Sequence, residues 1–143
     1  MRIASLVTVI GVVVLDLIFK TLAVARLPED GGRLRFPIDF ALHKNYGIAF
    51  DLPVPLWVVI PLTVLVLVIL VRELLRSKHD FSRLTALSMV AAGAMGNLID
   101  RIVYGFTVDY IILFGRSAIN LEDVLILSGI VWLALQPRAG THS

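Results

Sequence analysis

Long apolar segments alternate with shorter polar segments along this chain. The apolar runs of Val, Leu, Ile and Ala predict four spans, at about residues 3–25, 54–72, 84–104 and 119–136. A helix that crosses a membrane needs about 20 mostly apolar residues, and each run is close to that length. The pattern therefore predicts an all-α membrane protein with four transmembrane helices, in a single domain over residues 1–143. A cleaved signal peptide is the alternative for the first run, which however exceeds the usual hydrophobic region of roughly 7–15 residues.

Two polar segments lie on the same side of the predicted spans, at residues 26–53 and 105–118. The first contains Pro, Gly and charged residues, with a partly alternating pattern in RLRFPIDFALHKN that predicts short strands outside the hydrocarbon. A charged connector at residues 73–83 lies on the opposite side, together with both termini. Its cluster of basic residues, counted from Arg72 to Arg83, favours a cytoplasmic location for the termini.

Composition supports an integral membrane protein. Hydrophobic residues make up 58% of the chain and charged residues 17%, whereas soluble domains carry about 25% charged residues. There are no cysteines, which excludes disulfides, thiolate chemistry and cysteine-bound metals. His43 has no companion ligand at metal-binding spacing, so we expect neither a metal nor another cofactor. No basic run with interleaved aromatic residues supports nucleic-acid binding.

Most of the candidate chemistry lies between Gly96 and Asp123. This stretch also contains Asp100, Asp109 and Glu122. Each acid near hydrocarbon costs a few kcal/mol or more, so acids placed there usually have a function. The third span ends, and the fourth begins, at the same membrane surface, so Asp109 and Asp123 can meet across the loop. Two carboxylates in such a site share one proton. One can then activate a water while its protonated partner donates to a substrate carbonyl, as in aspartic proteases.

Several other ionisable residues have two interpretations each. Asp16 and Lys20 lie four residues apart on one helix face. They form either a self-neutralising pair, with Lys20 snorkelling toward the interface, or a functional pair. For Asp100 we favour a pair with Arg101 that anchors the helix end over direct catalysis.

The start of the fourth span leaves similar alternatives open. Glu122 lies about 100° around the helix from Asp123. It therefore faces solvent or headgroups, or it approaches Asp123 and shifts the pH optimum. Asn120 is an N-cap of the helix, an orienting hydrogen-bond partner of the two aspartates, or both. Asn45 and Gly47 form a turn after the first loop.

Five short motifs resemble those of one family. They read Asp16-Leu-Ile-Phe-Lys20, Asn45-Tyr-Gly-Ile-Ala-Phe50, Gly96-Asn-Leu-Ile-Asp-Arg101, Val108-Asp109-Tyr110 and Asn120-Leu-Glu-Asp123. In their order, spacing and span count they resemble the bacterial lipoprotein signal peptidases, or signal peptidase II, which are four-span aspartic proteases of the cytoplasmic membrane.

The resemblance assigns a role to each candidate residue. The catalytic pair falls on Asp109 and Asp123. The polar residues that line the site and hold substrate, or globomycin-type inhibitors, are Asn45, Asn97, Arg101 and Asn120. Structural support falls on Asp16, Lys20, Asp100, Gly47 and Gly96.

The resemblance also implies a substrate and a location. The substrate is a prolipoprotein whose cysteine already carries a diacylglyceryl group, and cleavage occurs just before that cysteine. Residues 26–50 correspond to an extracytoplasmic β-cradle and residues 105–117 to a short periplasmic helical region that covers the site. We expect a bacterial inner-membrane protein with cytoplasmic termini and an extracytoplasmic site. Lipoprotein substrates and membrane lipids are its expected partners, and an internal site within four spans predicts a monomer.

Three residues depart from the family pattern. Ile119 replaces a Phe, Glu122 replaces an Ala and Leu17 replaces a Gln, but none of these changes removes a catalytic group. A small proton- or ion-coupled transporter is the main alternative, because transporters also bury acids. Clustering of the acids at span ends on one side favours an enzyme. An inactive relative that serves as a scaffold is a second alternative, and the intact Asp109 and Asp123 argue against it.

Overall fold

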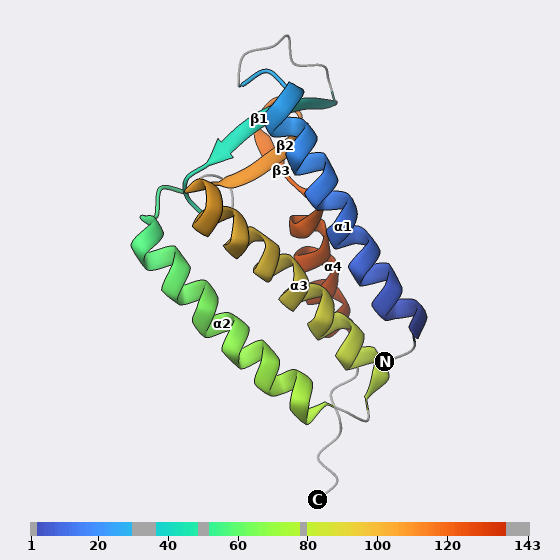
Figure 1. The fold of residues 1–143 in the computed structure, drawn as a ribbon. Coiled ribbons are helices and arrows are strands. Elements are labelled where there is room, and N and C mark those ends of the chain that lie inside the picture. The colour runs from blue at the N-terminus through green and yellow to red at the C-terminus, as the bar shows by residue number, and fades with distance from the viewer. Residues whose placement is uncertain (1–2, 30–36, 49–51, 78–79, 137–143) are drawn as a thin grey trace, which may run out of the picture.

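The computed structural model describes residues 3–29, 37–48, 52–77 and 80–136. Within these residues the chain forms a helix bundle with a small sheet at one end (Figure 1). The helices are α1 (Ile3–Arg26), α2 (Leu56–Arg76), α3 (Phe81–Tyr104) and α4 (Leu121–Leu135). The predicted connector 73–83 is too long, because α2 continues to Arg76 and the Asp80 side chain caps α3 by accepting a hydrogen bond from the Arg83 N–H.

The third helix is the centre of the bundle and packs most extensively against α4. Small residues let the two backbones approach. A Cβ atom at Gly93 would lie 2.5 Å from the carbonyl oxygen of Glu122, and one at Gly129 would lie 2.7 Å from that of Ala86. The small residues in the third apolar segment therefore serve close packing between helices, as their spacing predicts.

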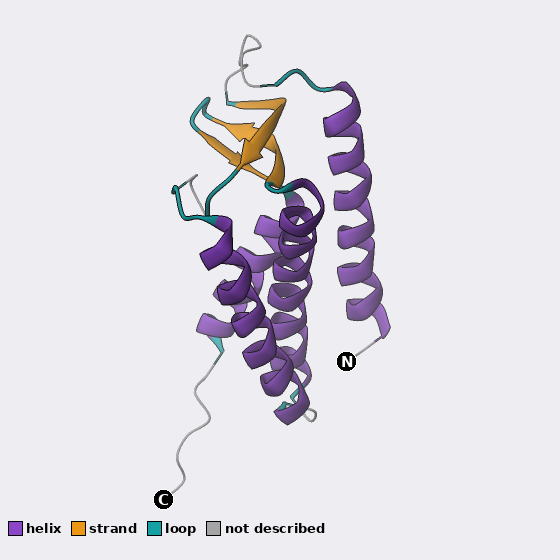
Figure 2. Cartoon of the chain, turned by 60° about the vertical axis from the view of Figure 1, so that its left-hand side comes forward, coloured by secondary structure: helices purple, strands orange, loops and turns teal. Residues whose placement is uncertain are grey.

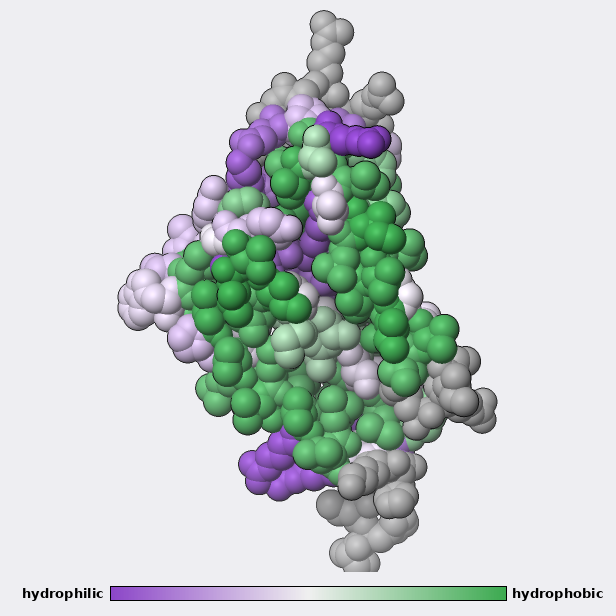
Figure 3. Space-filling model, viewed as in Figure 1, coloured by the Kyte–Doolittle hydropathy of each residue, from purple (hydrophilic) through white to green (hydrophobic). Residues whose placement is uncertain are grey.

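Three helices are long and apolar enough to cross a membrane: Ser5–Arg26, Leu56–Arg76 and Phe81–Tyr104. Apolar residues cover most of the surface over the middle of the molecule, and hydrophilic residues gather toward its two ends (Figure 3). The fourth helix has 15 residues, fewer than the about 20 that a perpendicular crossing needs. Four spans remain a prediction, whereas a mostly helical membrane-type protein is what the structure shows.

The sheet has three antiparallel strands in the order β1-β2-β3 and lies at the end of the bundle where α4 begins (Figure 2). The strands are β1 (Ile38–Asn45), β2 (Thr107–Leu113) and β3 (Ser117–Ile119). The strand prediction for the first polar segment is confirmed for β1, while residues 30–36 lie outside the described residues. In the register His43 lies opposite Asp109, beyond an irregularity that follows Phe40.

The helical region expected at residues 105–117 is wrong, because this segment forms β2, a turn and the start of β3. Gly105 ends α3 in the left-handed conformation, with φ 78°, which a residue without a Cβ adopts readily. The next residues, TVDYIIL, are mostly β-branched or aromatic and suit a strand. Phe114 and Gly115 both have positive φ and reverse the chain between the two strands.

Candidate active site

Asn120 is the residue around which the candidate site is built. Its Oδ1 accepts a hydrogen bond from the Asp123 N–H at 2.9 Å, and Asp123 Oδ2 accepts from the Asn120 N–H at 3.1 Å. This reciprocal capping box confirms the N-cap prediction. Because Oδ1 is occupied, the Nδ2 group points the other way and donates to Asp109 Oδ1 at 2.8 Å and to Asn97 Oδ1 at 3.1 Å.

Each of the two aspartates accepts two N–H donors. Asp123 accepts from the Asn97 side chain at 3.0 Å as well as from the Asn120 backbone. Asp109 accepts from the Asn45 side chain at 3.1 Å as well as from the Asn120 side chain. The structure thus gathers Asp109 and Asp123 around Asn120, with a further asparagine on each.

The environment of Asp109 favours retention of a proton. The residue is 1% exposed. Its pKa is raised from 3.8 to about 7, first by burial and then by the charge of Asp123, against the opposing effects of Asn45, His43 and Asn120. A pKa near 7 means that Asp109 keeps its proton below neutral pH.

Arg101 ties the turn after β1 to α3. Its guanidinium donates to the carbonyl oxygens of Asn97 at 3.1 Å and Gly47 at 3.2 Å. The Gly47 N–H in turn donates to Asn45 Oδ1 at 2.9 Å, which sets the direction of the Asn45 amide. Arg101 and Gly47 therefore hold in place the asparagine that contacts Asp109.

The predicted pair between Asp100 and Arg101 is wrong. Consecutive residues of a helix point about 100° apart, and here they face different elements. Asp100 Oδ2 lies 2.7 Å from Lys20 Nζ and accepts a hydrogen bond from the Val108 N–H at 3.1 Å. Asp100 thus connects α1 to the strand that carries Asp109.

A buried charge cluster lies beside the aspartates. Lys20 Nζ contacts Asp16 at 3.0 Å, Asp100 at 2.7 Å and Glu122 at 2.5 Å. The predicted Asp16–Lys20 pair is confirmed, but Lys20 is only 2% exposed and does not snorkel. Glu122 has no exposed surface, so its predicted position toward solvent or headgroups is wrong. Its carboxylate instead occupies space beside Gly96, where a Cβ atom would lie 1.6 Å from Oε1.

Sequence reasoning did not single out two further residues of the site. The Tyr110 hydroxyl donates to Asp16 Oδ1 at 2.8 Å, and the same oxygen accepts from the Leu121 N–H at 3.0 Å. His43 belongs to β1 and lies opposite Asp109. The alternating pattern predicts a strand at His43, but it does not show which strand pairs with it. Within the described residues, no group of three or more His, Asp or Glu side chains is arranged to hold a metal ion.

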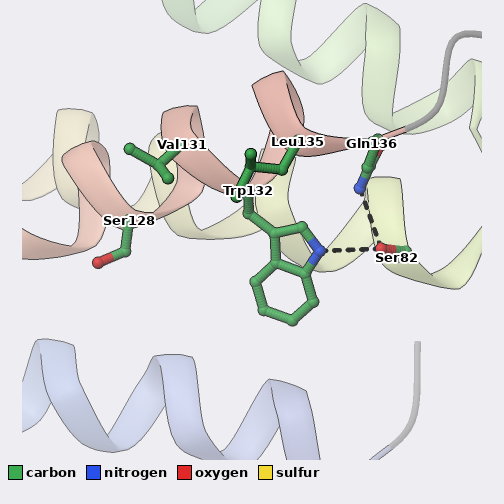
Figure 4. Close-up of a pocket in the computed structure, with 6 residues that line it drawn as sticks. All are labelled: Ser82, Ser128, Val131, Trp132, Leu135 and Gln136. Carbon is green, nitrogen blue, oxygen red and sulfur yellow. Dashed lines mark hydrogen bonds between the residues drawn. The ribbon is translucent and has the colours of Figure 1, made fainter.

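A separate groove lies toward the other end of α4, where Trp132 is about 14 Å along the helix from Asp123. Six residues line it: Ser82, Ser128, Val131, Trp132, Leu135 and Gln136. Trp132 Nε1 and Gln136 Nε2 both donate to Ser82 Oγ, at 2.9 Å and 3.0 Å (Figure 4). These bonds join the end of α4 to the start of α3, and the groove takes no part in the aspartate site.

The fold defines a membrane-type protein whose buried polar site lies where the helices meet the sheet. The chain belongs to the signal peptidase (SPase) II family, whose sequence profile matches residues 8–137. It is therefore a protease of the lipoprotein signal peptidase family, as its resemblance to that family implies.

Named relatives and solved structures agree with this membership. The lipoprotein signal peptidase of Buchnera aphidicola subsp. Acyrthosiphon pisum (strain APS) is 30% identical over 137 residues, covering 88% of this chain and 86% of the relative. The lipoprotein signal peptidase of Syntrophomonas wolfei is 36% identical over 130 residues, covering 87% of this chain and 85% of the relative. A bacterial membrane enzyme solved by the in meso method at 2.3 Å resolution has the same fold, with a TM-score of 0.81 at 22% identity over 94% of this chain and 87% of that one.

Proposed function

We propose that this protein removes the signal peptide from diacylglyceryl-modified prolipoproteins by cleaving just before the lipidated cysteine. Asp109 and Asp123 form the catalytic pair that activates water. The observation that carries the proposal is the convergence of both aspartates on Asn120. Relatives that cover most of the chain bear the name lipoprotein signal peptidase, which supports the substrate class.

The proposed reaction needs only the two carboxylates and a water. The ionised carboxylate takes a proton from the water as the water oxygen attacks the scissile carbonyl carbon. The protonated carboxyl donates to the carbonyl oxygen, which gives a tetrahedral diol. Collapse of the diol breaks the C–N bond: the protonated carboxyl gives its proton to the departing amine, and the ionised carboxylate takes a proton from a diol hydroxyl as the carbonyl re-forms. The four N–H donors on Asp109 and Asp123 hold the pair in place throughout.

The surroundings of the pair suit a substrate that arrives within the membrane. The helices below the sheet expose apolar side chains, beside which acyl chains and a signal helix can pack. Asn45, which contacts Asp109, and Arg101, which contacts Gly47, would orient the substrate backbone. We place the protein in the bacterial inner membrane as a monomer, with cytoplasmic termini and the site on the extracytoplasmic side. Globomycin-type inhibitors would occupy the same site.

The experiment uses purified protein in detergent with two matched substrates. One is a prolipoprotein that carries the diacylglyceryl group, and the other is the same polypeptide without it. We expect cleavage of the lipidated form alone, with the new N-terminus at the modified cysteine. Equal cleavage of both forms would contradict the proposed substrate class, and cleavage of neither by folded protein would contradict the proposed function.

A further inference from the structure

Glu122 is a buried acid that the proposed reaction does not use. Its Oε2 contacts Lys20, whereas the neighbouring Asp123 side chain contacts Asn97. These two successive acids of α4 therefore face different neighbours. Glu122 Oε1 is buried and finds no hydrogen-bond donor among the described residues. Burial of an acid with an unpaired oxygen costs stability, which the contact of its other oxygen with Lys20 offsets.

Lys20 connects the two chain segments that carry the predicted catalytic aspartates. The Lys20 ammonium forms ion pairs with three carboxylates, those of Asp16, Asp100 and Glu122, at 3.0, 2.7 and 2.5 Å. One of these, Asp100, also accepts a hydrogen bond from the Val108 N–H, and Val108 directly precedes Asp109. Another is Glu122, which directly precedes Asp123. A single ammonium therefore links the residue before each aspartate of the pair.

Gly96 makes this connection possible. A Cβ atom on Gly96 would lie 1.6 Å from Glu122 Oε1 and 2.1 Å from its Cδ. The glutamate carboxylate thus reaches Lys20 through space that any larger residue on α3 would fill. The absence of a side chain at Gly96 on α3 therefore makes room for the Glu122 carboxylate of α4.

We infer that Glu122 is a positioning residue for the Asp109–Asp123 pair. Through Lys20 and Asp100 it holds the first turn of α4 in a fixed place relative to β2. The inference rests on the proposed function, because it concerns the geometry of the cleavage step. Misplacement of reacting groups by about 1 Å can lower a rate by about 100-fold.

Substitution of Glu122 tests the inference directly. We expect Glu122→Ala to lower kcat for the lipidated substrate by about 10-fold or more while KM changes little. Glu122→Gln keeps the side-chain length and an oxygen acceptor for Lys20, so it should restore most of the lost kcat. Val124→Ala, an exposed position on the same turn, is the control and should retain parental kcat. A Glu122→Ala enzyme with the kcat of the control would overturn the inference.

Gly96→Ala provides a test that leaves Glu122 in the chain. The added Cβ displaces a flexible carboxylate, so Gly96→Ala and Glu122→Ala should lower kcat by similar factors. The double variant should be no slower than either single variant, since both remove the same connection. It should also melt above Gly96→Ala, because the clash is gone. A double variant whose loss in kcat equals the product of the two single losses would contradict the inference. If Gly96→Ala alone fails to fold, equal kcat for the double variant and Glu122→Ala carries the same test.

Gly93→Ala is the contrasting control. Its Cβ would meet the backbone oxygen of Glu122, which Glu122→Ala does not remove. Adding Glu122→Ala should therefore not raise the melting temperature of Gly93→Ala.

Cleavage by the unmodified protein separates failure of the proposed function from failure of the positioning role. Absence of cleavage by the unmodified protein contradicts the proposed function, whereas parental cleavage with unchanged kcat in Glu122→Ala contradicts the positioning role alone.

Discussion

At the scale of single residues, burial and neighbouring charge set the chemistry of Asp109. In the folded protein its pKa is about 7, compared with an ordinary 3.8. The folded state therefore binds this proton more tightly than the unfolded state does. The stability that Asp109 contributes is fully present below about pH 4 and is lost as the pH rises toward 7.

Thermal melting across this pH range tests the assignment. Asp109→Asn cannot titrate, so it lacks this loss. We expect the melting temperature of the variant, relative to that of the parent, to rise between about pH 4 and pH 7 and to level off above it. A difference that stays constant over the range would show that Asp109 titrates normally.

Residue motifs predicted which polar side chains gather, but not every direction in which they point. Asn45, Asn97 and Asn120 all donate to the two aspartates, and their expected contacts with substrate stay a prediction. The helical rotation of 100° correctly separates Glu122 from Asp123. The rotation cannot show which residue Glu122 faces. That residue is Lys20, on a helix 102 residues earlier in the chain.

At the scale of elements, the first turn of α4 combines a helix cap with the site. The Asn120 side chain accepts from the Asp123 N–H and donates to Asp109. Its two functions can be separated by substitution, because a serine caps a helix but has no amide donor.

We expect Asn120→Ala to lose about 0.5–2 kcal/mol of stability because the cap is removed. Asn120→Ser should retain most of that stability. Both variants should lose most cleavage activity, since neither donates an amide N–H to Asp109. Denaturant unfolding and cleavage of the lipidated substrate measure the two effects. Full activity in Asn120→Ser would show that the amide has no role beyond the cap.

Elements defined by local pattern were predicted well, and those defined by distant pairing were not. Apolar runs located the four helices to within a few residues. The segment at 105–117 was expected to be helical, yet β2 forms because it pairs with β1, whose partner residues lie 62 to 75 positions earlier. The strand-forming residues after Gly105 carried the signal, but the resemblance favoured a helix.

At the scale of the whole molecule, the sheet and its site lie at one end, while α1 begins and α4 ends at the other (Figure 1). If the four helices cross the membrane, these two ends face opposite compartments. The chain has no cysteine, so single introduced thiols can report which side each end faces.

We expect a membrane-impermeant maleimide to label Ser117→Cys, beside the sheet, in intact spheroplasts. Ser77→Cys, between α2 and α3, and Gln136→Cys, after α4, should be labelled only after lysis. Labelling of Gln136→Cys in intact spheroplasts would contradict a fourth span. The reverse pattern at Ser77 and Ser117 would contradict the proposed orientation.

Cleavage by the two aspartate variants tests the central claim most directly. Asp109→Asn and Asp123→Asn keep the size of each side chain, and both should fold with parental far-ultraviolet circular dichroism. Each should lose at least about 1,000-fold in cleavage of the lipidated prolipoprotein, because the pair can no longer exchange protons with water and substrate. Asp39→Asn on β1, where the carboxylate accepts from the Phe40 N–H, is the matched control and should cleave at the parental rate. Loss of cleavage in both variants with activity in the control is the predicted result, and parental cleavage by either variant would contradict the aspartate pair.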